Sequence, residues 1–113
     1  MRRLRRPNLL VLTLILALRI CCAQNFRGSL VGTVKDSSGG RIPFATLIVE
    51  ASASSSERHA ECDGQGEFTL SDLPPGVYSV TARSSGFADA RTTITIRVTS
   101  VREISVTLYP AAS

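Results

Sequence analysis

The sequence predicts an all-β domain, a seven-stranded β-sandwich that follows a signal peptide. Beyond residue 23, apolar and polar residues alternate with a period of two, and no segment sustains the 3.6-residue period of a helix. Clusters of Gly, Pro, Ser and Asp interrupt the alternation every 8 to 14 positions. Seven short strands cannot cover their apolar faces as one flat sheet, whereas two sheets packed face to face can.

The first 23 residues have the pattern of a secretory signal peptide. Four arginines precede an apolar stretch from Asn8 to Leu18, and Cys21 and Ala23 occupy the positions that a signal peptidase reads. The apolar stretch is about half of the ~20 residues that a membrane-spanning helix needs. We therefore expect a signal peptide at 1–23, a domain at 24–113 and an exported protein. An uncleaved or lipidated anchor is the alternative.

The charge balance excludes nucleic-acid binding. The chain has a net charge of +4, but five of its thirteen basic residues and none of its nine acidic residues lie before residue 24. The remainder carries eight basic and nine acidic side chains, without a basic stripe. Only Cys62 remains beyond residue 23, so an internal disulfide is impossible. We expect Cys62 to be a small apolar filler rather than a reactive thiol.

Four strands are expected in the first half of the domain. The first, Ser29–Lys35, places Leu30 and Val34 on one face and ends at the glycine-containing turn "DSSGG". A serine-rich loop separates the second strand from the third, and the tight turn "DGQG" separates the third from the fourth. These strands are expected at Ala45–Ala51, Arg58–Cys62 and Glu67–Leu70, with Leu47, Val49, Phe68 and Leu70 facing inward.

Three more strands are expected in the second half. They cover Val77–Arg83, Thr92–Val98 and Glu103–Leu108, and the last two are rich in the β-branched residues that favour strands. The inward positions of these strands are Tyr78, Val80, Ala82, Ile94, Ile96, Val98, Ile104, Val106 and Leu108.

The segment "LSDLPPGVYSV" joins the fourth strand to the fifth. Leu73 is apolar inside a loop, which predicts that it plugs the sandwich. Pro74 and Pro75 lack N–H donors and cannot extend a sheet, while Gly76 can adopt a positive φ and reverse the chain. Tyr78 then re-enters the core. The backbone path alone accounts for these residues, so the segment indicates a structural crossing rather than an active site.

Five short motifs in order resemble the carboxypeptidase regulatory-like domain over about residues 28–109. They are G-x-V-x-D, G-x-x-I-P-x-A-x-L-x-V, D-x-x-G-x-F-x-L, L-P-P-G-x-Y-x-V and G-F. Each motif is weak alone, and the ordered set is specific. The residues that carry the resemblance are Gly32, Asp36, Pro43, Ala45, Asp63, Gly66, Phe68, Leu73, Pro74, Pro75, Gly76, Tyr78, Gly86 and Phe87.

The resemblance implies a transthyretin-like (prealbumin-like) Greek-key sandwich, related to carbohydrate-binding-like folds and not itself catalytic. The same module stands behind the signal peptide of bacterial TonB-dependent outer-membrane receptors. The resemblance therefore implies an interaction or spacer module of the cell envelope, which is either a fragment of a longer receptor gene or a stand-alone protein. A carbohydrate-binding module and an accessory domain of a secreted peptidase are the alternatives. We expect a protein partner or an adjacent envelope domain, with a glycan as the other candidate. We expect no cofactor, and membrane contact only through the signal peptide or a barrel absent from this chain.

The candidate catalytic and metal sites are weak. His59 is the only histidine, whereas a hydrolytic zinc site commonly uses two, so we expect a solvent-facing loop residue. The segment Asp63–Glu67 lacks the ligand spacing of an EF-hand, which favours a simple turn over a calcium loop. Lys35 has no asparagine after it with which to form an isopeptide cross-link. We expect no enzyme, metal or catalytic residue.

One possible interaction surface involves Val31 and Ile48. Both residues point away from the inward residues of their strands. If the first two strands are neighbours, these side chains form a small exposed apolar patch suited to docking another domain. The alternative is that the segment around Phe26 covers them.

Overall fold

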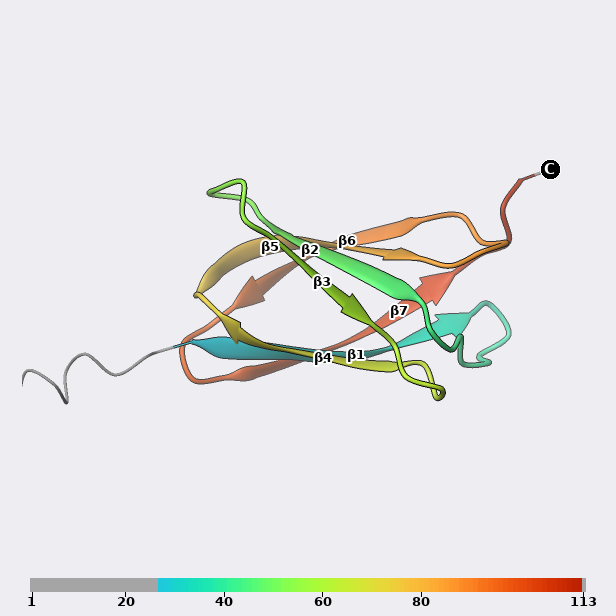
Figure 1. Cartoon of the computed structure of the whole chain (residues 1–113), viewed down its shortest axis with the longest axis horizontal. Coiled ribbons are helices and arrows are strands. Elements are labelled where there is room, and N and C mark those ends of the chain that lie inside the picture. Colours follow the sequence, from blue (N-terminus) through green and yellow to red (C-terminus); the bar gives the residue numbers. More distant parts are fainter. Residues whose placement is uncertain (1–26, 113) are drawn as a thin grey trace, which may run out of the picture.

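The computed structural model describes residues 27–112, which form two β-sheets packed face to face (Figure 1). Within this part of the chain there are seven strands and no helix, which confirms the predicted all-β sandwich. The predicted signal peptide lies outside the described residues. The strands are β1 (Gly28–Asp36), β2 (Thr46–Ala51), β3 (Glu57–Glu61), β4 (Glu67–Leu73), β5 (Gly76–Arg83), β6 (Ala90–Ile96) and β7 (Val101–Leu108).

The chain crosses repeatedly between the two sheets. One sheet has the order β4-β1-β7 and the other the order β3-β2-β5-β6. β1 and β7 run parallel, and every other pair is antiparallel. The connection from β4 to β5 is one of the crossings, and it lies at the same end of the sandwich as the start of β1 (Figure 1).

The core lies between the sheets because alternate residues of each strand face inward. Leu30 and Val34 of β1 are fully buried, as are Leu47 of β2 and Leu108 of β7. Burying such side chains contributes about 1.5–3 kcal/mol each, which is the main force that holds the sheets together. None of the described segments is a helix long and apolar enough to cross a membrane.

The ring of Phe68 packs directly against Gly32, which has no side chain. A Cβ added at Gly32 would lie 2.6 Å from Cζ of Phe68 and 2.7 Å from the carbonyl oxygen of Ile104. Phe68, on the neighbouring strand β4, is buried and occupies the space that a side chain at position 32 would need. This glycine is therefore required by close packing.

The prediction for the sixth strand is wrong at both ends. β6 begins at Ala90 and ends at Ile96, so Val98 is outside the strand and half exposed. Residues 97–100 turn the chain into β7: the Ser100 hydroxyl bonds the Arg97 carbonyl, and Thr99 has a φ of +48°. The apolar alternation continues past the point where the backbone leaves the sheet.

Candidate functional site

The connection between β4 and β5 is confirmed as a structural crossing. Leu73 is fully buried as the predicted plug, although it belongs to β4 rather than to a loop. Pro74 and Pro75 are exposed, and Gly76 opens β5 with a φ of +151°, a conformation that L side chains rarely adopt. The buried Tyr78 donates its hydroxyl hydrogen to the carbonyl oxygen of Pro74 at 2.5 Å.

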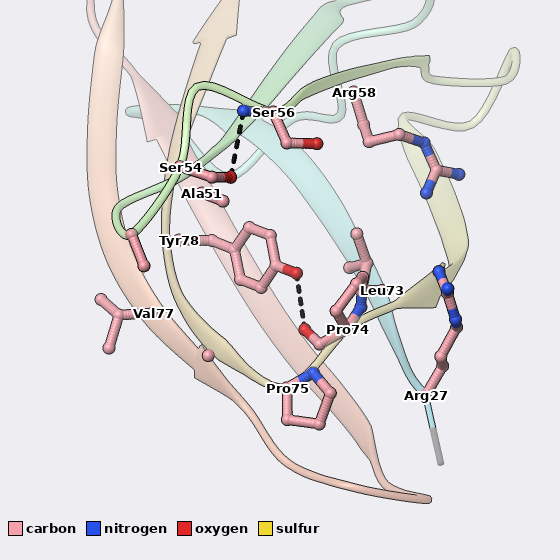
Figure 2. Close-up of a pocket in the computed structure, with 12 residues that line it drawn as sticks. Arg27, Ala51, Ser54, Ser56, Arg58, Leu73, Pro74, Pro75, Val77 and Tyr78 are labelled. Carbon is pink, nitrogen blue, oxygen red and sulfur yellow. Dashed lines mark hydrogen bonds between the residues drawn. The ribbon is translucent and has the colours of Figure 1, made fainter. Parts of the chain in front are cut away.

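A pocket of about 350 Å³ lies beside this connection; we call it the PPG pocket (Figure 2). It is bounded by the β4–β5 connection on one side and by the loop at 52–56 between β2 and β3 on the other. Its apolar lining comes from Ala51, Ala53, Leu73, Pro75, Val77 and the ring of Tyr78. Its polar lining comes from Arg27, Ser54, Ser56 and Arg58.

A β-bulge in β4 positions the two arginines. β4 pairs Leu73 with Gly28 and Leu70 with Leu30, so Ser71 and Asp72 stand opposite a single residue of β1. Asp72 has a φ of +59° within this bulge. Bulges break the ladder and redirect backbone groups. The exposed backbone carbonyl groups accept three hydrogen bonds from the arginines. The backbone oxygen of Asp72 accepts from Arg27 (3.3 Å) and Arg58 (3.4 Å), and the backbone oxygen of Ser71 accepts from Arg58 (3.1 Å).

Arg27 and Arg58 line the pocket together with Tyr78. Burial raises the pKa of the Tyr78 hydroxyl, and the positive charges of Arg27 and Arg58 oppose this rise. Figure 2 shows the two guanidinium groups pointing toward one another on the same side of the pocket as Leu73. The pocket therefore combines an apolar wall with a positively charged edge.

Two aspartates of the family motifs close turns at the other end of β1 and of β4. The Asp36 carboxylate accepts hydrogen bonds from the amides of Ser38 and Gly40, both at 2.9 Å, and from the Ser38 hydroxyl at 2.6 Å. The Asp63 carboxylate accepts from the amides at positions 65 (2.8 Å) and 67 (3.0 Å). These bonds hold the pKa of each carboxyl below its usual value, led by the Ser38 hydroxyl for Asp36 and by the amide at position 67 for Asp63. The segment Asp63–Glu67 is thus a turn, as predicted.

The remaining motif residues serve the backbone and the core. Ala45 is fully buried, whereas Pro43 is exposed in the turn before β2. Gly66 has a φ of +74°, and its carbonyl accepts the Val34 amide at 2.8 Å. Gly86 has a φ of +87°, and the half-buried Phe87 packs against the core and bridges to residue 110 near the end of the chain.

The patch predicted from Val31 and Ile48 does not form. β1 and β2 belong to different sheets, so the two outward side chains lie on opposite outer faces of the sandwich. Both side chains are also half-buried rather than exposed. The prediction required β1 and β2 to be neighbours in one sheet. The chain instead crosses from one sheet to the other between them.

The other candidate reactive groups are dispersed. His59 is exposed as expected, but it lies in β3 rather than in a loop, and its Nε2 is 3.8 Å from Glu57. Cys62 is buried as the predicted apolar filler, and burial raises the pKa of its thiol to about 11. Among residues 27–112, no three His, Cys, Asp or Glu side chains are close enough to hold a metal ion.

Comparison with protein families decides the classification. The model of the carboxypeptidase regulatory-like domain matches residues 29–109. The chain belongs to this family. The match covers all seven strands of the regulatory-like domain, apart from Gly28 at the start of β1, and the PPG connection. A search of curated protein sequences gave no match.

Solved structures share the sandwich of this regulatory-like domain. The minor pilin GBS52 of Streptococcus agalactiae matches with a TM-score of 0.62 and 16% identity, over 78% of this chain and 46% of the pilin. Catechol 1,2-dioxygenase of Acinetobacter sp. ADP1 matches with a TM-score of 0.65 and 10% identity, over 79% and 54%. A Bacteroides uniformis protein proposed to bind carbohydrate matches with a TM-score of 0.61 and 12% identity, over 74% and 41%. The chain thus spans about half of each structure, and at these identities the likeness concerns the fold.

The bulge and the two arginines are not among the features predicted from the sequence. The signal was available in "LSDL", where Leu70 and Leu73 are both apolar but three positions apart. A regular strand places only even-spaced residues on one face, so two inward leucines at this spacing require one extra residue. The prediction of a loop from residue 71 onward is therefore wrong for residues 71–73, which belong to β4. Arg27 and Arg58 lie close together only because of the crossover between the sheets, which no local sequence pattern reveals.

Proposed function

We propose that this protein is a non-catalytic, exported interaction or spacer module of the bacterial cell envelope. The observation that carries the proposal is the family match over residues 29–109. The expected signal peptide directly before this domain supports export.

The side chains that could react are hydrogen-bonded or buried, which supports a non-catalytic role. The Tyr78 hydroxyl donates a hydrogen bond to the Pro74 carbonyl oxygen, and the Cys62 thiol is buried, with its pKa raised to about 11. A nucleophilic cysteine instead needs a lowered pKa and access to substrate. His59 is exposed on the edge strand β3, and its described charged partner is Glu57.

The finer proposal is attachment at the N-terminus of a TonB-dependent outer-membrane receptor. The order of a signal peptide followed at once by this domain supports it. In that setting the sandwich would contact an envelope protein or space the receptor from one, and its activity would be binding.

Export and processing test the proposal. The full chain is expressed with a C-terminal tag in a Gram-negative host, and the mass of the protein in each cell fraction is measured. We expect a periplasmic or membrane-associated product that begins at Gln24. The variant Leu14→Arg interrupts the apolar stretch and should hold the unprocessed chain in the cytoplasm. A native chain that stays in the cytoplasm at full mass contradicts the proposal.

Carbohydrate binding is the second candidate, favoured by the similarity to the Bacteroides uniformis protein. Phe44 and Tyr109 are 63% and 60% exposed and supply aromatic surface. They stand outside the PPG pocket, whose one aromatic lining residue, Tyr78, is 5% exposed. A glycan array probed with the exported protein separates the two candidates: specific binding that is lost in Phe44→Ala or Tyr109→Ala favours the second.

A further inference from the structure

The PPG pocket brings an apolar surface next to two cations. Pro75, Val77 and Tyr78 contribute apolar lining, and Arg27 and Arg58 stand together at one edge (Figure 2). A complementary ligand must therefore be apolar where it enters the pocket and negatively charged where it meets the guanidinium groups.

The β4 bulge holds the two positive charges close together. Arg27 and Arg58 donate to the same carbonyl oxygen of Asp72, at 3.3 and 3.4 Å. Two cations that share one acceptor repel one another, and an anion between them relieves that repulsion. Arg58 forms no salt bridge with any carboxylate in residues 27–112. Its hydrogen bonds to Ser71 and Asp72 use two of the five N–H groups that a guanidinium carries.

The anion that fits best is a carboxylate. The planar guanidinium matches the two oxygens of a carboxylate in a bidentate arrangement. A pocket of about 350 Å³ accommodates one or two amino-acid side chains. A sugar ring would need an exposed aromatic plane to stack on, and Tyr78 as a residue is only 5% exposed. An apolar side chain can instead pack against Pro75 and Val77, which line the pocket and are exposed.

We propose that the PPG pocket binds an acidic peptide segment of a partner protein, with an apolar side chain against Pro75 and Val77 and a neighbouring carboxylate between Arg27 and Arg58. The inference rests on the proposed interaction role and names the chemistry of the partner. It assigns a ligand class to a surface that the family motifs explain only as a turn.

The test uses the exported protein, purified from the periplasm and labelled with nitrogen-15. The probe is the peptide acetyl-Gly-Ser-Leu-Glu-Gly-Ser-amide, and binding is followed by the amide resonances. We expect shift changes centred on residues 73–78 and at Arg58. Replacing the peptide's glutamate by glutamine, or its leucine by serine, should weaken binding about tenfold or more, because each change removes one half of the recognition.

Variants of the protein test the contribution of the positive charge of Arg58. Arg58→Gln should weaken binding of the acidic peptide about tenfold, and Arg58→Lys should retain part of it because the charge remains. Lys35→Gln removes the same charge from the far end of β1, about 26 Å from Arg27 along the strand, and should change affinity less than about twofold. The dispersion of the amide spectrum shows whether each variant is folded, so a loss of binding can be assigned to the pocket.

Three results would overturn the inference. They are no shift change at 73–78 with the acidic peptide at about 5 mM, equal binding of the neutral peptide, and preferential binding of a glucuronic-acid hexasaccharide over the peptide. Failure of the proposed function looks different, because it leaves an unprocessed chain in the cytoplasm. A protein that is exported but does not bind the peptide rejects the pocket assignment alone.

Discussion

The hydroxyl of Tyr78 donates a hydrogen bond to the carbonyl oxygen of Pro74, four residues earlier in the chain, at 2.5 Å. The bond ties the start of β5 to the proline turn that precedes it, and the buried ring fixes the turn against the core. It stabilises the crossing between the two sheets and also shapes one wall of the PPG pocket. Fold and candidate site therefore depend on the same residue.

Tyr78→Phe should destabilise the domain by about 1 kcal/mol, because it removes one partly buried hydrogen bond and leaves the Pro74 carbonyl without its partner. Tyr78→Ala should cost about 3–5 kcal/mol, since it also opens a cavity in the core. Urea unfolding at neutral pH measures both values. Equal effects of the two substitutions would show that the hydrogen bond, rather than the ring, carries the stability.

Gly32→Ala should destabilise the domain by about 1–3 kcal/mol, because the added Cβ meets Phe68 at 2.6 Å and the Ile104 carbonyl oxygen at 2.7 Å. Gly64→Ala is the matched control, since its Cβ would lie 3.8 Å from Phe44 in ordinary contact. Thermal unfolding compares the two. If the control were as damaging as Gly32→Ala, close packing at β1 would not be the cause.

Stability should fall on acidification, in part through Asp63. Hydrogen bonds from the amides at positions 67 and 65 hold the pKa of this carboxyl below its usual 3.8. A carboxyl whose pKa is lower in the folded state stabilises the fold above its unfolded-state pKa and loses that contribution as pH falls through the folded-state pKa. Asp63→Asn should therefore be less stable than the native protein at pH 6 and less sensitive to acid below about pH 4.

Urea unfolding between pH 6 and pH 3 measures this difference. Glu50→Gln serves as the control, because no hydrogen bond or salt bridge of Glu50 is found among the side-chain contacts of residues 27–112. An acid dependence of Asp63→Asn identical to that of the native protein would contradict the assigned role of the turn.

Stability should also fall in alkaline solution, through Cys62. Burial raises the pKa of the thiol from 9.0 to about 11. An acid whose pKa is higher in the folded state stabilises the fold below its unfolded-state pKa, and the contribution is lost as pH rises toward the folded-state value. The free energy of unfolding should thus decrease between pH 9 and 11, and Cys62→Ala should reduce the decrease. Tyr78, whose pKa is also raised by burial, should preserve part of it.

A thiol reagent gives a second measurement of Cys62. Because the side chain is 2% exposed, modification of the folded protein at pH 8 should be slow and should accelerate when urea unfolds the domain. Equally fast modification in the absence of urea would show that the thiol is accessible.

Most of the fold could be predicted because alternation and turn residues are local signals. The inward positions of β1, β2 and β5 follow from period two, and Leu73 is buried as expected. Val98 is the exception, because apolar alternation continues beyond Ile96, the last residue of β6, and Val98 is 51% exposed. Hydrophobic pattern reports which residues could face a core, and the backbone turn decides where the sheet ends.

The candidate site was less predictable because it depends on contacts between distant segments. Arg27 and Arg58 are 31 positions apart in the sequence, and they meet only because both reach the Asp72 carbonyl. The Val31–Ile48 patch failed for the same reason, since pairing between strands is a property of the whole topology. The odd spacing of Leu70 and Leu73 was the one local sign of the bulge.

The claim that this protein works by contact through its PPG pocket is tested most directly by cross-linking in living cells. A photoreactive amino acid replaces Val77, which lines the pocket and is 45% exposed, and Thr33 on the outer face of the other sheet serves as the control. We expect Val77 to give a discrete adduct with an envelope protein, whose cross-linked peptide contains Asp or Glu, and Arg58→Gln to diminish it. An adduct from Thr33 but none from Val77, or one that Arg58→Gln leaves unchanged, would contradict the claim.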